Sequence, residues 1–162
     1  LSVTLTKWID QDRKLAGLKA LQGMIWDEGY RQRAFAAELY GDVLPALTRW
    51  GARGIRLGIY SSGSKQAQRL LFAHTNAGDV TSLFEHFFDT SVGEKKVASS
   101  YRTISDQIGL PPHDILFLSD VEGELDAAAL TGFGTAHIVR PGTDASTRHL
   151  VHIDLAHLLL EG

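Results

Sequence analysis

The sequence contains no cysteine, which excludes disulfides, thiolate nucleophiles and cysteine-based zinc sites. It has no apolar run near the roughly 20 residues that span a bilayer and no recognisable signal peptide. Neither sign of charge dominates, because the net charge of -3 comes from interspersed acids and bases. This balance argues against nucleic acid or an anionic membrane as the main partner. We therefore expect a soluble, cytoplasmic protein.

The 162 residues, 44% of them hydrophobic, can form one ordinary domain with a sizeable core, or a core with a small appendage. Residues 1–40 carry apolar side chains at spacings of three to five and no strand signal, which predicts helices. From residue 42 onward, helical segments alternate with short apolar strands. The expected helices cover 43–53, 64–73, 94–108, 122–130 and 153–160, and the expected strands cover 55–60, 84–88, 115–118 and 136–139.

Strands without polar alternation are buried on both faces. The alternation after residue 42 therefore predicts an α/β fold with a doubly wound parallel sheet. Asp42 is a plausible N-cap for the first helix of this part. Its strand at 55–60 ends in Ser61-Ser62-Gly63-Ser64 and leads into the next helix. A turn of this kind directs backbone N–H groups and the positive end of a helix at one point, so it can bind an anion.

Polar residues also follow two further strands. Lys95 and Lys96 lie after the strand at 84–88, and Ser119-Asp120, with Glu124 a turn later, follow the strand at 115–118. Hydroxyls, a lysine and carboxylates are the groups that phosphoryl chemistry with Mg²⁺ requires. Each has a plainer interpretation, because the serines and Asp120 can cap helices and the lysines can be solvated. The seven histidines form no metal-binding pattern, and we expect His149 and His152 at the surface.

The same segments resemble the enolase-phosphatases of methionine salvage (acireductone synthases), which belong to the haloacid dehalogenase superfamily. The matching stretches run from about residue 12 to residue 144. They are Leu18–Trp26 with Gly29-Tyr30, Tyr60–Ser64 with Ala67-Gln68, Phe88–Thr90 with Gly93 and Lys95, Phe117–Val121, Glu124–Ala128 and Val139–Gly142. The resemblance implies a haloacid-dehalogenase-like core over residues 41–162. It also implies that residues 1–40 are the remainder of a helical cap.

The resemblance further implies a hydrolase whose substrate is a small phosphorylated diketone, 2,3-diketo-5-methylthiopentyl-1-phosphate. Mg²⁺ assists its enolisation, and an aspartate then takes the phosphoryl group. The roles implied for this chain are phosphate binding by Ser61 and Ser62, charge neutralisation by Lys95, Mg²⁺ ligation by Asp120 and support of the site by Glu124. Lys96 replaces Lys95 if the register of the match slips by one. Trp26 and Tyr30 either close over the substrate or pack in the cap core.

One feature of the family is missing from the sequence. The family begins with a strand carrying Asp-x-Glu-Gly-Thr, which supplies the nucleophile and the general acid/base, and no such motif occurs here. In the superfamily that strand lies between the strands at 55–60 and 115–118. We expect the 162-residue chain to be a truncated, inactive enolase-phosphatase. We also expect the gap to be filled by direct strand pairing, by self-association or by an upstream segment, because unpaired apolar strands aggregate.

Two other functions fit parts of the pattern. Another capped phosphatase of the superfamily would share the core residues, and only the segment from Gln22 to Trp26 argues against it. A non-catalytic phosphate-binding module would need only a lysine and the turn formed by residues 61–64, which we call the serine turn. A receiver domain is disfavoured because its strand-end residues come in the order Asp, Ser/Thr, Lys, whereas this chain has Ser, Lys, Asp.

Overall fold

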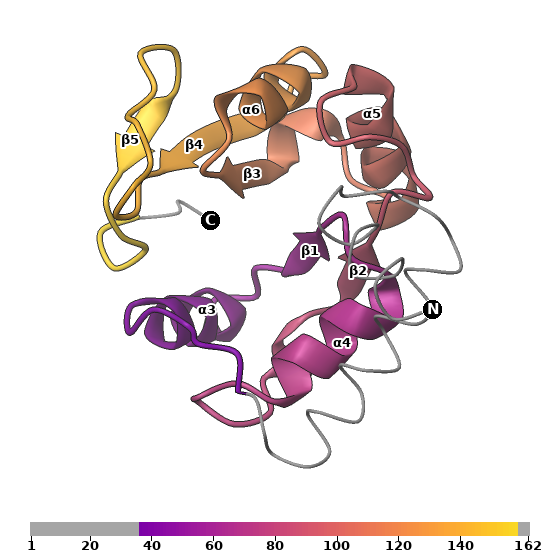
Figure 1. The fold of residues 1–162 in the computed structure, drawn as a ribbon. Helices are drawn as coiled ribbons and strands as arrows, with labels where there is room; N and C mark the ends of the chain where they lie inside the picture. Colours follow the sequence, from indigo (N-terminus) through magenta and orange to yellow (C-terminus); the bar gives the residue numbers. More distant parts are fainter. Residues whose placement is uncertain (1–35, 159–162) are drawn as a thin grey trace, which may run out of the picture.

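The computed structural model describes residues 36–158 (Figure 1). Trp26 and Tyr30, and all but the last few residues of the predicted cap at 1–40, lie outside the described residues. Within 36–158 no helix combines the length and the hydropathy that crossing a membrane requires.

Helices and strands alternate along the described chain, as the sequence predicts. The helices are α3 (Val43–Ala52), α4 (Lys65–Ala73), α5 (Ala98–Ile108) and α6 (Glu122–Ala129), with 3₁₀ turns at η1 (Thr81–Leu83) and η2 (Pro112–Asp114). The strands are β1 (Gly58–Tyr60), β2 (His86–Phe88), β3 (Leu116–Ser119), β4 (Gly134–Ile138) and β5 (Leu150–His152). All strand pairs are parallel, so the predicted α/β class with a parallel arrangement is confirmed.

Two of the predicted helices differ from the structure, one in where it begins and one in whether it forms. The helix predicted over 94–108 begins only at Ala98. The helix predicted over 153–160 does not form in its described part, because 150–152 pairs with β4 and 153–158 is irregular. In that segment the Leu155 N–H donates to the Asp42 carboxylate, and Arg49 donates to the carbonyl oxygens of Leu155 and Ala156. Side chains thus satisfy backbone groups that a helix would otherwise pair.

The strands form two sheets rather than one. β1 pairs with β2, and a separate sheet has the order β3-β4-β5. In Figure 1 the two-stranded sheet lies with α3 and α4, and the three-stranded sheet lies opposite it with α5 and α6. Direct pairing of the strands at 55–60 and 115–118, one of the three expected repairs, is therefore wrong.

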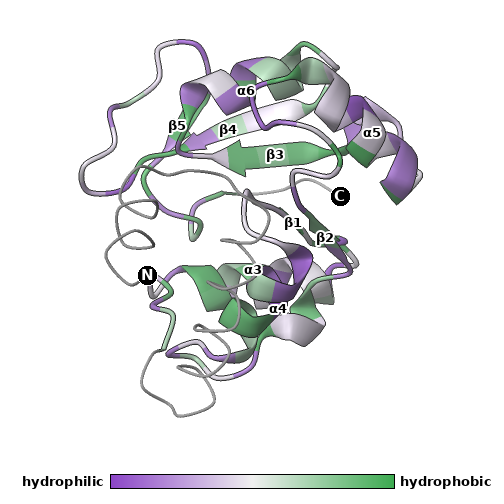
Figure 2. Cartoon of the chain, turned by 45° about the vertical axis from the view of Figure 1, so that its right-hand side comes forward, coloured by the Kyte–Doolittle hydropathy of each residue, from purple (hydrophilic) through white to green (hydrophobic). Residues whose placement is uncertain are grey.

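Side chains join the two sheets where backbone bonds do not. Ile59 of β1 and Leu118 of β3 both pack against one buried cluster, which includes Trp50. Tyr60 and Phe117 both pack against the second cluster, and their ring centroids lie 6.5 Å apart. Figure 2 shows β3 as hydrophobic along its length, with hydrophobic segments in α3 and α4 below it. Each of the two buried clusters is therefore packed against side chains from both sheets.

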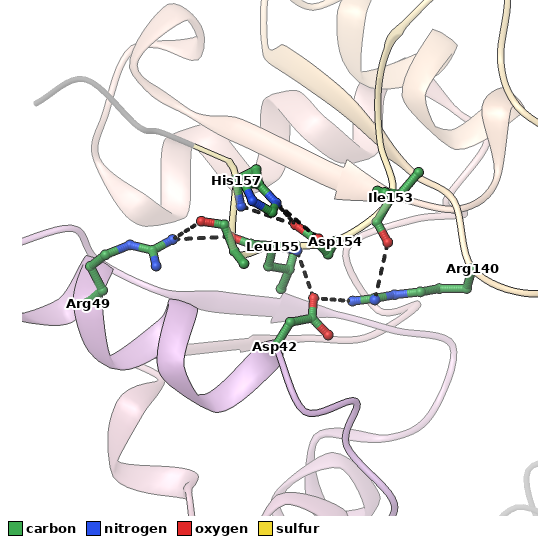
Figure 3. Close-up of polar contacts among 8 residues, drawn as sticks. Asp42, Arg49, Arg140, Ile153, Asp154, Leu155 and His157 are labelled. Carbon is green, nitrogen blue, oxygen red and sulfur yellow. Dashed lines mark hydrogen bonds and ion pairs between the residues drawn. The ribbon is translucent and has the colours of Figure 1, made fainter.

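Asp42 fixes one side of this assembly. It occupies the N-cap position of α3 but makes no capping bond. Its Oδ2 instead accepts hydrogen bonds from Arg140 Nη2 and from the Leu155 N–H, both at 2.7 Å (Figure 3). Burial opposes ionisation of Asp42, but these bonds outweigh it and hold the pKa of the carboxyl below its usual value. We call Asp42, Arg140 and Leu155 the Asp42 clamp; it ties α3 to the segment after β5.

Candidate active site

Three strand ends supply the polar groups that the sequence pattern singles out. Ser61 follows β1, Asp89 follows β2, and Ser119 ends β3. The carboxyl ends of paired parallel strands share one edge, where ligands bind in open α/β sheets; β1 and β2 share such an edge, and β3 ends at that of the second sheet. Lys95 comes from the loop before α5, and its Nζ lies 6.0 Å from the ring centroid of Tyr60. Lys95 thus lies close to the side chain of Tyr60, the residue before the Ser61–Ser64 turn.

The turn after β1 already uses several of its own donors. Ser64 caps α4, because its Oγ accepts from the Ala67 N–H at 3.2 Å. Ser61 Oγ accepts from the Gly63 N–H, and the Lys65 N–H donates to Asp89 Oδ2, both at 3.2 Å. These three N–H groups are bound within the protein, so an anion here depends more on the Ser61 and Ser62 hydroxyls than the sequence suggested.

Asp89 adds a resident negative charge to the start of α4. Burial raises the pKa of its carboxyl, but hydrogen bonds from Ser91 and the Lys65 N–H outweigh burial and leave the pKa below its usual value. The carboxylate is therefore ionised near neutral pH and occupies part of the positive end of the helix. A bound phosphate would need a compensating cation close by.

Gln68 of α4 supports the serine turn through hydrogen bonds, although no role was predicted for it. It is 4% exposed, and its Nε2 donates at 2.8 Å to both the Gly63 and Phe88 carbonyl oxygens. Its buried Oε1 has no hydrogen-bond partner among the described residues. The Gln68 amide thus ties the serine turn to the end of β2. A polar residue on the inward face of an amphipathic helix is the signal that could have revealed it.

Lys95 supplies a cation and is paired with Glu124. Its Nζ lies 2.6 Å from Glu124 Oε2, and Ser119 Oγ donates to the same oxygen at 2.9 Å. Glu124 is 7% exposed, and a buried carboxylate requires partners of this kind. The structure thus brings together three predicted residues from the loop before α5, from β3 and from α6. Lys96 is exposed, and its aliphatic stem lies beside Gly123.

Asp120 has the chemistry of a magnesium ligand. It is exposed at the end of β3, and its carboxylate makes no hydrogen bond or ion pair with any residue in 36–158. Mg²⁺ prefers hard oxygen donors, keeps several waters and needs only one or two protein carboxylates. Asp120 fits as one such ligand. In the described part of the chain no group of three or more acids and histidines could form a complete metal site.

His137, which sequence reasoning missed, holds the backbone of Asp120. The side chain lies in β4 and is 2% exposed. Its Nδ1 accepts from the Ser146 N–H at 2.9 Å, so Nε2 carries the proton and donates to the Asp120 carbonyl oxygen at 3.1 Å. A histidine inside an apolar strand is the signal that could have identified it. A pocket of about 470 Å³ beside it is lined by Asp120, Glu122 and the loop at 142–146.

His149 was expected at the surface, but its side chain is buried. Its side chain is 6% exposed and lies between Thr135 Oγ1 at 2.8 Å and Asp126 Oδ1 at 2.9 Å. Arg148, the residue before it, forms ion pairs with Asp126 and Glu122. These contacts attach the loop after β4 to α6.

Sequence comparison links the chain to proteins that share these segments. The sequence profile of the haloacid dehalogenase-like hydrolases matches residues 4–132. The enolase-phosphatase E1 of a Picosynechococcus strain is 52% identical over 146 residues, which cover 90% of this chain and 64% of that protein. The enolase-phosphatase E1 of Cronobacter sakazakii is 51% identical over 156 residues, covering 95% and 68%. The chain thus spans just under two thirds of the first relative and just over two thirds of the second.

Structural comparison gives a consistent result. The crystal structure of the UTR4 protein of Saccharomyces cerevisiae superposes with a TM-score of 0.86 at 33% sequence identity, covering 96% of this chain and 73% of that one. CbbY from Rhodobacter sphaeroides, in complex with phosphate, superposes with a TM-score of 0.73 at 16% identity, covering 89% and 65%. At that identity the second likeness concerns the fold alone.

Proposed function

The chain belongs to the haloacid dehalogenase-like hydrolases and, within them, to the enolase-phosphatases, and on that premise we propose that the intact enzyme dephosphorylates a small phosphorylated diketone. The substrate that we propose is 2,3-diketo-5-methylthiopentyl-1-phosphate of methionine salvage, enolised with Mg²⁺ before its phosphate is removed. The observation that supports this most directly is the pairing of Lys95 with Glu124 near Tyr60, the residue before the serine turn.

In this proposal the serine turn and Lys95 bind the phosphate. The Ser61 and Ser62 hydroxyls donate to its non-bridging oxygens; the Ser61 hydroxyl, which accepts a bond from the Gly63 N–H, still has its own proton to donate. The Lys95 ammonium neutralises the charge that develops during transfer. Glu124 sets the direction of that ammonium, since its carboxylate is fixed by the Ser119 hydroxyl.

Asp120 would hold Mg²⁺, and the metal would supply positive charge for the enolate and phosphate oxygens. His137 would keep the Asp120 peptide in place through its bond to the carbonyl oxygen. This arrangement leaves the Asp120 carboxylate, which has no partner within residues 36–158, available as a ligand.

We further propose that these 162 residues are inactive by themselves, because they contain no Asp-x-Glu-Gly-Thr segment. A strand carrying those acids would complete the site between β1 and β3, which belong to separate sheets. The side chains that would flank it are apolar on both faces, Ile59 and Leu118 on one and Tyr60 and Phe117 on the other. Such a strand should therefore be apolar on both sides, as inner parallel strands are.

A turnover assay tests both parts of the proposal. The chain is compared with a version preceded by a segment that supplies the family's Asp-x-Glu-Gly-Thr strand, with and without Mg²⁺. We expect no turnover from the chain alone and Mg²⁺-dependent turnover from the extended protein. A version with the supplied nucleophilic Asp changed to Asn serves as the control. Turnover by the chain alone would contradict its inactivity, and an inert extended protein would contradict the proposed function.

Lys95→Met and Lys96→Met form a matched pair in the extended protein. Loss of one electrostatic stabiliser lowers kcat by about a hundredfold or more, and we expect that loss only for Lys95→Met. An equal loss from Lys96→Met alone would assign the role to Lys96. A preference for other phosphate esters would instead favour another capped phosphatase. Phosphate binding by the extended protein without turnover would favour a binding module.

A further inference from the structure

A row of buried hydroxyl groups holds the loop that carries Lys95. We call residues 93–96 the lysine loop. Its three consecutive carbonyl oxygens, those of Gly93, Glu94 and Lys95, each accept a side-chain hydroxyl. The donors are Tyr60 Oη at 2.9 Å, Ser100 Oγ at 2.7 Å and Tyr101 Oη at 2.6 Å, in that order.

The two donors on α5 are fully buried, since Ser100 and Tyr101 are both 0% exposed. The rings of Tyr60 and Tyr101 meet edge to face with centroids 5.7 Å apart, and Phe117 packs on Tyr101 at 5.1 Å. Burial raises the pKa of Tyr101 far above its usual value, with smaller contributions from the charge of Glu124 and from Tyr60. Its hydroxyl is therefore a proton donor at every pH near neutrality.

The lysine loop lies directly on Ser100. Gly93 has a φ of +130°, and a Cβ placed there would lie 2.1 Å from Ser100 Oγ. Only glycine tolerates both the backbone angle and the close approach. The loop also has few backbone bonds of its own, such as Val97 N–H to the Glu94 carbonyl. Its conformation therefore depends on the three hydroxyls.

We propose that Tyr101 and Ser100, with Tyr60, are positioning residues that hold Lys95 in the orientation in which its ammonium meets Glu124 at the edge of the sheets. The catalytic meaning of this proposal rests on the proposed function, in which Lys95 binds phosphate. The positioning of Lys95 does not rest on the proposed function, because it concerns contacts within this chain. Tyr101 has the largest role, since it bonds to the carbonyl of Lys95 itself. The ammonium is thus placed before any phosphate arrives.

Competitive acetylation with a trace of acetic anhydride measures this positioning without any activity. The rate at which Lys95 is modified is read by mass spectrometry of the 162-residue chain, with the exposed Lys65 as internal reference. An ammonium held against Glu124 reacts slowly because it must first leave its carboxylate partner. In Tyr101→Phe we expect the rate at Lys95 to rise about five- to tenfold, the shift that loss of one such hydrogen bond produces. Ser100→Ala should act in the same direction.

Ser105→Ala is the matched control. Ser105 is a second buried serine on α5, and its Oγ donates at 2.7 Å to the Leu110 carbonyl, away from the lysine loop. The same atom is lost on the same helix, so stability should fall by a similar amount while Lys95 reacts as in the unchanged chain. Unchanged Lys95 rates in both Tyr101→Phe and Ser100→Ala would overturn the proposal, as would an equal rise in Ser105→Ala.

Ser100→Ala, compared with Ser105→Ala, decides the matter if Tyr101→Phe does not fold, because Ser100 binds the lysine loop through a separate hydrogen bond, to the Glu94 carbonyl. Failure of the proposed function alone would appear as an inert extended protein, while Lys95 would still be acetylated faster in Tyr101→Phe and Ser100→Ala. Failure of the positioning would appear in the acetylation rates alone.

Discussion

Strands β3 and β4 are paired neighbours, yet they are buried to very different extents. β3 has the more hydrophobic sequence, Leu-Phe-Leu-Ser, and none of its residues is buried. β4 contains a threonine and a histidine, and its last three residues are buried. β4 has a strand on each side, β3 and β5, whereas β3 has one on a single side. Between these two strands, the extent of burial follows the number of neighbouring strands and not the hydrophobicity of the sequence.

β1, in the two-stranded sheet, is also incompletely buried and also has a strand on one side only. Its Ile59 and Tyr60 are half-buried, although each packs against the core that it shares with β3. The two half-buried strands are thus those at which a further parallel strand would fit. The following substitutions test this difference, and each is measured by urea unfolding of the 162-residue chain unless another method is named.

Ile138→Ala in β4 should have the largest effect. Ile138 is 8% exposed and lies in the cluster formed with Trp50 and Leu155. Removal of a buried aliphatic side chain leaves a cavity and typically costs about 3 kcal/mol. A loss below about 1 kcal/mol would show that β4 is no better packed than β3.

Asp42→Ala should follow, because the Asp42 clamp joins α3 to the segment after β5 without strand pairing. Its ion pair is mostly buried, with side-chain exposures of 17% for Arg140 and 15% for Asp42. We expect a loss of about 2 kcal/mol, between the values for exposed and for fully buried pairs. The matched control is Asp154→Ala, which removes an exposed contact with His157 and should change stability little.

The clamp also predicts a pH dependence. The pKa of Asp42 is lowered in the folded chain, so its contribution is fully present above the unfolded pKa of about 4 and is lost as the pH falls through the folded pKa. The difference between the unchanged chain and Asp42→Ala should therefore shrink below about pH 4. A difference that stays constant down to acidic pH would contradict the assignment.

Leu118→Ala in β3 should have a smaller effect than Ile138→Ala, although both side chains pack on the same cluster. We expect about 1 kcal/mol, because Leu118 is only half-buried and part of its surface remains in water. In the extended protein with its additional strand, the same substitution should cost about 3 kcal/mol. Equal costs in both proteins would mean that no strand enters beside β3.

Leu116→Lys should have the smallest effect on stability, below about 0.5 kcal/mol. Leu116 is 37% exposed and begins β3. A lysine on an open strand edge opposes pairing with another chain, so the variant tests self-association, one of the alternatives that the sequence left open for filling the gap beside β3. Sedimentation should show concentration-dependent association that this variant reduces. Leu150→Lys, on the far edge of the same sheet, is the control and should leave it unchanged.

Much of the fold followed from local patterns. The alternation of helices and apolar strands predicted nearly all elements, because periodicity and turn residues act over a few positions. The C-terminal helix failed because Asp42 and Arg49, more than 100 residues away, bind the backbone that would have formed it. No local pattern contains that contact.

Part of the candidate site could be predicted from the sequence, and part depends on the tertiary structure. Strand ends in a parallel sheet share an edge, so the order of Ser61, Lys95 and Asp120 in the sequence predicts that they lie together. The bond from His137 to the Asp120 carbonyl and the tie that Gln68 makes below the serine turn depend on register and on side-chain packing. These were visible only in the assembled structure.

The sequence by itself determined the α/β class, the family and the chemical groups at three strand ends, because each is encoded in residues close together along the chain. The tertiary structure decided which groups are paired. It divided the strands into two sheets, joined Lys95 to Glu124 and placed three hydroxyls on the lysine loop. Those outcomes depend on which surfaces meet across the fold, and burial then requires every polar group there to find a partner.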